Sequence, residues 1–299
     1  MPASPIRLAS FDARLRSLPW PARGRVEEAH AHSAVVVLAD GGGLVLLAAG
    51  RPLVPWGVRL PAEARLPGPG SAVLLEDGRL RILEPGREQE PFFFEGEGQE
   101  LHVPCRVERA KPGRVAASVW AELPDRTRAL LRGSAPPTDP TDRTDRSDRS
   151  ERSQPGFDQL EIHLLTFTLK EILSCVLRPA GQPAMATVVR RLAGLGRGST
   201  PAGDDLLAGA AAAARALGLP GARALCGCLA ELPAGHTTPA GGAMLREAAR
   251  GYYPAPLATA ARSLPRLDPA PLRDLAGLGA TSGADMLAGF LAMLEEPHA

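Results

Sequence analysis

The 299-residue sequence predicts an α+β protein, a β-rich N-terminal domain followed by a mostly α-helical C-terminal domain. Short β-branched and leucine runs separated by Gly, Pro and Asp fill residues 31–132, whereas apolar residues at helical spacing dominate after Phe157. Between them, residues 134–155 contain no large apolar side chain. We therefore expect domains at 1–133 and 156–299, joined by a disordered Ser/Thr/Asp/Arg linker at 134–155.

Two β-hairpins are expected in the N-terminal domain. Residues 34–38 and 44–47 flank a Gly-rich turn, and residues 72–75 and 80–83 flank the sequence Glu-Asp-Gly. Gly at such a turn tolerates a positive φ angle without steric cost. Two further apolar segments are strand candidates because they are rich in aromatic or β-branched residues: Phe92–Phe94 and Val115–Trp120.

The C-terminal domain is expected to consist of helices, because its apolar residues recur three and four positions apart. Pro and Gly residues separate the successive periodic segments and mark helix ends. The expected helices cover residues 160–176, 185–193, 206–217, 225–232, 243–249, 257–264, 272–275 and 286–294.

Composition excludes several function classes. A net charge of +1 is too small for a polyanion-binding surface, so no nucleic acid partner is expected. The sequence contains no run of about 18 apolar residues, the length that a membrane span requires, and its N-terminus does not resemble a secretory signal. We therefore expect a cytoplasmic protein. The four cysteines are too scattered for a disulfide framework.

The most specific motif is GLGRGSTPAGDD at residues 194–205. Its glycines let a backbone approach a ligand closely, Thr200 is the expected N-cap, and Pro201 suits the first helical position. Unpaired N–H groups at such a helix start form an anion site. The alternative is an ordinary helix C-cap, tight turn and N-cap, whose acidic residues complement the helix dipole.

A second copy of this motif follows at residues 277–289, with a loop three residues shorter. Small residues at matching positions would let the two helices approach closely, and Asp205 and Asp285 would face each other. Converging carboxylates are costly unless they bind a cation, share a proton or accept N–H donors. The alternative is an old duplication whose aspartates only cap local turns. The matching pairs are Gly203 and Gly283, Asp205 and Asp285, Leu207 and Leu287, Ala208 and Ala288, and Gly209 and Gly289.

A third segment, Gly235–Gly242, lies between the two copies and contains His236, Thr237 and Thr238. His236 is a candidate general acid or base, since an imidazole titrates near neutral pH. A lone loop histidine is more often solvated or caps a helix, and that alternative remains open.

Three stretches together resemble a bacterial family that includes the AllH-like subunit of oxamate carbamoyltransferase: residues 194–205, Thr237-Thr238 and residues 279–285. The resemblance covers the helical part well and the β-rich part only in outline, at residues 31–60. The sequence departs from the family at Gly241, where Ser is usual, at Arg197, where Pro is common, and in the insertion at 141–152.

The resemblance implies a carbamoyltransferase subunit that works with two other subunit types, moving a carbamoyl group between oxalurate and phosphate. The expected ligand is a small anionic metabolite of the carbamoyl phosphate or oxamate type. Candidate catalytic residues are Asp204, Asp205, Asp285 and His236, and the three aspartates are also candidate ligands of Mg²⁺. Candidate ligand-binding residues are Gly196, Arg197, Gly198, Ser199, Thr200, Gly203, Thr237, Thr238, Thr281, Ser282 and Gly283.

Other functions remain open from the sequence. The chain contains no obvious activated nucleophile, so a non-catalytic metabolite-binding or scaffold subunit is one alternative. A metal-dependent hydrolase that requires Mg²⁺ or Mn²⁺ is another. The small residues of 208–214 also permit self-association into a homo-oligomer.

Overall fold

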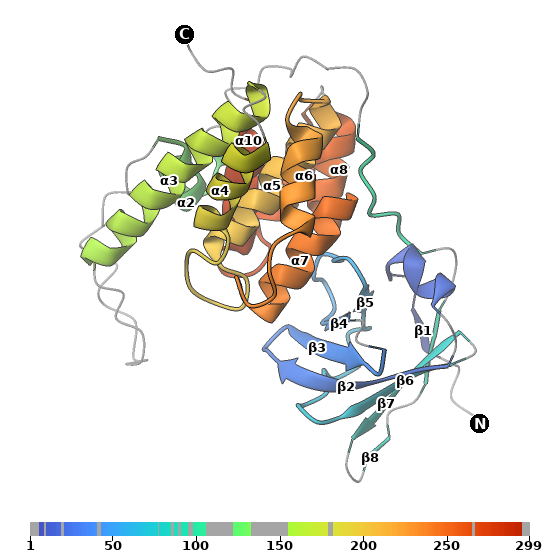
Figure 1. The fold of residues 1–299 in the computed structure, drawn as a ribbon. Coiled ribbons are helices and arrows are strands. Elements are labelled where there is room, and N and C mark those ends of the chain that lie inside the picture. The colour runs from blue at the N-terminus through green and yellow to red at the C-terminus, as the bar shows by residue number, and fades with distance from the viewer. Residues whose placement is uncertain are drawn as a thin grey trace. The chain divides into compact units, whose positions relative to one another are not determined.

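The computed structural model confirms the α+β fold class (Figure 1). The chain divides into two compact units, Met1–His102 with Tyr253–Ala255, and Val103–Tyr252 with Pro256–Ala299. The predicted strand Val115–Trp120 and nearly all of the predicted linker lie outside the described residues. The structure describes residues 6–8, 10–18, 21–40, 43–76, 78–84, 87–88, 91–94, 98–105, 122–132, 155–178, 182–264 and 267–294.

The described part of the first unit contains one mixed β-sheet and a short 3₁₀ helix, η1 (Ala13–Ser17). The strand order is β1-β9-β7-β6-β2-β3-β4-β5, and β8 pairs with β7. The strands are β1 (Ile6–Leu8), β2 (Ala22–Ala29), β3 (Ser33–Leu38), β4 (Gly43–Leu47), β5 (Gly57–Arg59), β6 (Ala72–Glu76), β7 (Arg79–Glu84), β8 (Arg87–Glu88) and β9 (Phe92–Phe94).

Both predicted hairpins and the predicted strand at Phe92–Phe94 are confirmed. β3 pairs antiparallel with β4, β6 pairs antiparallel with β7, and Gly78 between the latter two has a φ of +72°. Along these strands buried residues alternate with more exposed ones, so one face of the sheet packs on the core. Strand β2 was not predicted, because Val26 is its only buried residue and charged residues surround it.

The second unit is helical, and all eight predicted helices are present. The helices are α2 (Asp125–Arg132), α3 (Pro155–Leu177), α4 (Gln182–Leu192), α5 (Ala202–Leu217), α6 (Ala222–Ala230), α7 (Pro239–Arg250), α8 (Ala255–Ser263), α9 (Pro269–Ala276) and α10 (Ser282–Ala292). The expectation that strands continue to residue 132 is wrong, because α2 is a helix that packs on α10 and α3. Within the described ranges, no helix is both long enough and apolar enough to cross a membrane.

Helix α5 forms the centre of the helical unit, in contact with α10, α7, α6, α4 and α3 (Figure 1). Every α5 residue is buried except Arg215, which is intermediate. Such a helix needs small or apolar side chains on all sides, and the Ala-rich sequence of α5 provides them.

Helices α5 and α10 touch each other through their backbones. A Cβ atom added to Gly209 would lie well within 3.0 Å of the Met286 carbonyl, and one added to Gly289 would lie equally close to the Leu206 carbonyl. Leu206 and Met286 occupy equivalent positions in the two copies of the motif. The two contacts are therefore exchanged by a pseudo-two-fold axis, as in a symmetric dimer interface.

This close packing predicts opposite effects for two glycine substitutions. Gly209→Ala should lower the free energy of unfolding by about 3 kcal/mol, because a packed backbone must shift. Gly227→Ala in α6 is the control, since its added Cβ meets nothing within 4 Å. That change should raise stability by about 0.5–1 kcal/mol through helix propensity. Urea unfolding followed by circular dichroism measures both, and a loss of similar size in both variants would contradict the interpretation.

Candidate ligand-binding site

The two loop–helix units repeat the same backbone geometry. In the first copy, Leu195 N–H donates to the Leu192 carbonyl at 3.1 Å, and Gly203 N–H donates to the Leu195 carbonyl at 2.8 Å. A Cβ at Gly203 would collide with the Leu192 carbonyl, so this position requires glycine. In the second copy, Leu278 N–H donates to the Leu275 carbonyl at 2.9 Å, and Gly283 N–H donates to the Leu278 carbonyl at 2.8 Å. A Cβ at Gly283 would collide with the Leu275 carbonyl, so this position also requires glycine.

Thr200 does not cap α5, contrary to the sequence prediction. Pro201 occupies the N-cap position without any side-chain capping bond, and the helix begins at Ala202. The Thr200 hydroxyl instead forms a 2.9 Å hydrogen bond with the hydroxyl of Ser282 at the start of α10. A tertiary contact has replaced the local cap, and it links the two units.

Asp204 is fully buried and has strong local partners. It accepts the Gly194 N–H at 2.8 Å and the Thr237 hydroxyl, and it lies against Gly241 in the first turn of α7. Burial raises the pKa of Asp204, and the Thr237 and Gly194 donors oppose this rise. A Cβ at Gly241 would collide with the Asp204 carboxylate, so the close packing at this position requires glycine.

Asp285 is fully buried and pairs with an arginine that sequence analysis missed. Arg126 Nε on α2 donates to Asp285 Oδ1 at 2.6 Å, while Arg126 Nη2 donates to Glu161 on α3 at 3.1 Å. The Thr127 hydroxyl donates to the Ala284 carbonyl at 2.9 Å and fixes α2 on α10. Burial raises the pKa of Asp285 to about 6, although Arg126 favours its charged form.

Asp205 is fully buried, and neither of its carboxyl oxygens has a hydrogen-bond partner among the described residues. Burial raises the pKa of Asp205 well above its usual range, and the negative charges of Asp285 and Asp204 raise it further. The nearby Ser282 and Thr200 hydroxyls favour its charged form, and they form a 2.9 Å hydrogen bond with each other. The two repeat aspartates are thus neighbours, but only Asp285 has an ion-pair partner among the described residues.

The loop preceding α5 presents an exposed backbone. Arg197, Gly198 and Ser199 are exposed, and the N–H groups of residues 196–199 donate to no other described residue. Gly196 and Gly198 have φ angles of +115° and +97°, which favour glycine. The Thr238 hydroxyl donates to the Ser199 carbonyl and accepts the Gly241 N–H at 3.0 Å, so it ties this loop to α7.

His236 lies against the end of α4 and has a structural partner. Its Nε2 donates to the Arg190 carbonyl at 2.7 Å, and its own backbone packs against Gly194. This bond matches the capping alternative for His236. Thr281 is exposed and makes no side-chain capping bond at the start of α10.

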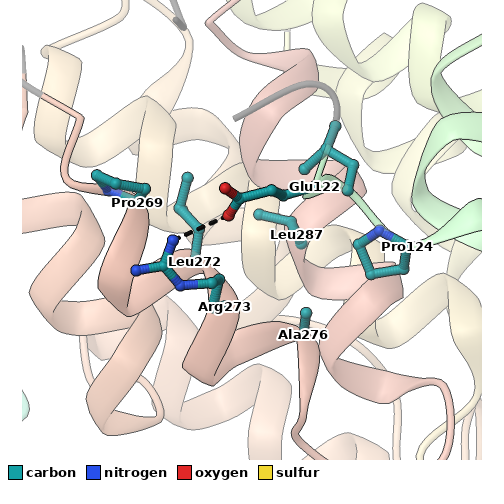
Figure 2. Close-up of a pocket in the computed structure, with 8 residues that line it drawn as sticks. Glu122, Pro124, Pro269, Leu272, Arg273, Ala276 and Leu287 are labelled. Carbon is teal, nitrogen blue, oxygen red and sulfur yellow. Dashed lines mark hydrogen bonds and ion pairs between the residues drawn. The ribbon is translucent and has the colours of Figure 1, made fainter. Parts of the chain in front are cut away.

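Two further features were compared with the positions of Asp204, Asp205 and Asp285: metal-binding clusters and the pocket in Figure 2. Among the residues described, no three or more His, Cys, Asp or Glu side chains form a group that could hold a metal ion. None of the candidate site residues lines the pocket in Figure 2. Its lining, crossed by a 2.9 Å Arg273–Glu122 ion pair, is Glu122, Leu123, Pro124, Pro269, Leu272, Arg273, Ala276 and Leu287.

Removing the Thr237 hydroxyl should destabilise the helical unit. Thr237→Val keeps the side-chain shape but leaves buried Asp204 with fewer donors, at a cost of about 1.5–3 kcal/mol. Thr187→Val is the matched control, because that exposed hydroxyl only bonds the Pro183 carbonyl within α4. Urea unfolding at pH 7 compares the two, and equal stability losses would argue against a supporting role for Thr237.

Stability should fall as pH rises from about 4 to about 6. In this range the folded chain keeps the proton of Asp285, whose pKa is raised to about 6, while the unfolded chain releases it near 3.8. The loss attributable to this group is about 3 kcal/mol and levels off above pH 6.

The test measures unfolding free energy at pH 4.5 and 6.5. Asp285→Asn should flatten the pH dependence, whereas Asp274→Asn, at an exposed position on α9, should leave it unchanged. An unchanged slope in Asp285→Asn would show that Asp285 titrates in its ordinary range.

Comparison with known proteins supports the family resemblance for one part of the chain. Residues 192–294 match the family model described as oxamate carbamoyltransferase subunit AllH. No curated protein and no solved structure matches the chain. The matched segment begins at the last residue of α4 and ends just after α10, so it contains both loop–helix units and α7. The resemblance to the oxamate carbamoyltransferase subunit AllH is thereby confirmed for residues 192–294.

Proposed function

We propose that the helical unit acts as an oxamate carbamoyltransferase subunit of the AllH type and binds a small anionic metabolite where its two loop–helix units meet. The observation that carries the proposal is the direct contact between the two loops. The Thr200–Ser282 hydrogen bond joins the two loops beside Asp205, a fully buried carboxyl without a partner among the described residues. The family match covers both loops.

The exposed loop before α5 is suited to the anionic end of the ligand. Four consecutive N–H groups, those of residues 196–199, are available as donors, and they precede the positive end of the α5 dipole. The Arg197 side chain adds a positive charge at the same loop. Phosphate or carboxylate oxygens would therefore find backbone and guanidinium donors together.

Carbamoyl transfer requires donors for the charge that develops on the carbonyl oxygen and on the leaving phosphate. In this proposal the 196–199 backbone and Arg197 serve the phosphate or carboxylate. His236 is a weaker candidate than the sequence alone implied, because its Nε2 is bonded to the Arg190 carbonyl. The other two subunit types of the enzyme, implied by the resemblance, would supply the remaining groups.

A non-catalytic binding or scaffold subunit is the second candidate, and one observation favours it. Leu160, Leu164 and Phe167 on α3 are 60%, 45% and 60% exposed, and they lie on one helix face. Exposed apolar patches of this kind mark protein interfaces. A scaffold subunit would bind its partners through such a face and show no turnover by itself.

The first test is a thermal-shift screen of the purified chain with carbamoyl phosphate, phosphate, oxamate and oxalurate, each with and without Mg²⁺. At a ligand concentration of about 100 times Kd, a specific ligand should raise the melting temperature by about 5–10 °C. Asp205→Asn should lose this shift while keeping its helical content, because the buried carboxyl contacts the ligand.

Asp274→Asn is the control, since it makes the same chemical change at an exposed site on α9. It should keep the full shift. If none of the four compounds stabilises the wild-type chain, or if Asp205→Asn responds like wild type, the proposed site is wrong. Activity of the isolated chain with oxalurate and phosphate would count against the scaffold candidate.

A further inference from the structure

The two repeat aspartates occupy equivalent positions but differ in one respect. Asp285 Oδ1 receives a planar N–H donor, the guanidinium of Arg126, at 2.6 Å. Both oxygens of Asp205 are buried, and no N–H group of a described residue donates to them, although the Thr200 and Ser282 hydroxyls lie near. The Oδ2 atom of Asp285 is also unpaired among the described residues, so the two carboxyls differ by one charged donor. Buried carboxyl oxygens nearly always have donors in folded proteins, because an unpaired buried acceptor is costly. The asymmetry points to a donor that a bound molecule brings to Asp205.

We propose that Asp205 accepts the N–H groups at the carbamoyl or carboxamide end of the ligand and so selects ligands with –NH₂ over ligands with a methyl group in its place. This inference rests on the proposed function, since it gives the ligand of that site an orientation. The anionic end then lies at the exposed N–H groups of residues 196–199. Asp205 has two other acids nearby, Asp204 and Asp285, and negative charge there would repel a phosphate. This repulsion supports placing the amide end of the ligand, rather than its anionic end, at Asp205.

The groups around Asp205 match both halves of an amide. An –NH₂ group is planar and carries N–H donors, like the guanidinium that Asp285 already holds. A carboxyl keeps an acceptor oxygen whether or not it carries a proton. The amide carbonyl needs a donor, and the Thr200 and Ser282 hydroxyls beside Asp205 can supply one once a ligand separates them from each other.

Access to Asp205 requires a local rearrangement. The carboxyl is 0% exposed, so a ligand can reach it only if the structure opens locally. In our proposal this opening separates the Thr200–Ser282 pair, which lies beside the carboxyl. The two hydroxyls that the ligand separates are the ones that would then bond its carbonyl. Recognition of the amide and opening of the site are therefore coupled at the same two side chains.

The experiment uses two pairs of probes that differ only in –NH₂ against –CH₃. Carbamoyl phosphate is compared with acetyl phosphate, and oxamate with pyruvate, by titration calorimetry on the full chain. Wild type should bind the –NH₂ member of at least one pair about tenfold more tightly or better, since a methyl group leaves the buried carboxyl unpaired. Equal affinity within both pairs overturns the inference and leaves the proposed function standing.

Variants identify the residue responsible. Asp205→Leu should remove the preference for –NH₂ and bind the methyl-bearing probes at least as tightly as wild type, a gain that a misfolded variant cannot show. Arg197→Ala should weaken both members of a pair by the same factor and keep their ratio, because it acts on the anionic end. A preference that survives in Asp205→Leu would assign the selection to another residue. If none of the four probes binds wild type, the proposed function itself fails.

Discussion

The backbone contact between α5 and α10 is the constraint on which the rest of the helical unit depends. Gly209 lies on the Met286 carbonyl and Gly289 on the Leu206 carbonyl, so the two helices pack without intervening side chains. Because both contacts lie one to two turns into their helices, the first turns are also neighbours. Asp205 and Asp285 are consequently close enough that the charge of one raises the pKa of the other, and the Thr200 and Ser282 hydroxyls meet at 2.9 Å.

The three buried aspartates show how partners, rather than burial, set the role of a carboxyl. All three are fully buried, and burial raises the pKa of each. Asp204 is held by a backbone N–H and a hydroxyl at the start of α7, which makes it part of the scaffold. Asp285 has a guanidinium. Asp205 alone of the three receives neither a backbone N–H nor a guanidinium from a described residue, and this difference is the basis of the ligand role that we propose for it.

The elements that could be predicted from the sequence are those that local sequence patterns determine. Helices of the second unit follow from apolar spacing, and both hairpins follow from Gly-containing turns, because these signals lie within a few residues of the structure they cause. The repeat of residues 194–209 in 277–289 was visible for the same reason. Most of the fold and the pairing of the two loops could therefore be predicted.

Long-range contacts could not be predicted in this way. Arg126 lies 159 residues from Asp285 in the sequence, and nothing around it marks it as a partner. Thr200 has the sequence of a cap, yet it bonds across the repeat interface, because the α5–α10 crossing offers it Ser282. Strand β2 was missed because its charged residues obscure a single buried valine.

The pseudo-two-fold axis has a consequence for how such a site can diverge. In a dimer of identical loop–helix units, every substitution appears twice, so both acids must keep the same surroundings. A chain that carries both copies in tandem is free of that restriction. Here one copy has a loop three residues longer and the other has acquired an arginine from a different helix. Covalent linkage of the halves thus allows two related acids to acquire different surroundings: Asp285 is fixed by Arg126, while Asp205 is left for the ligand contact that we propose.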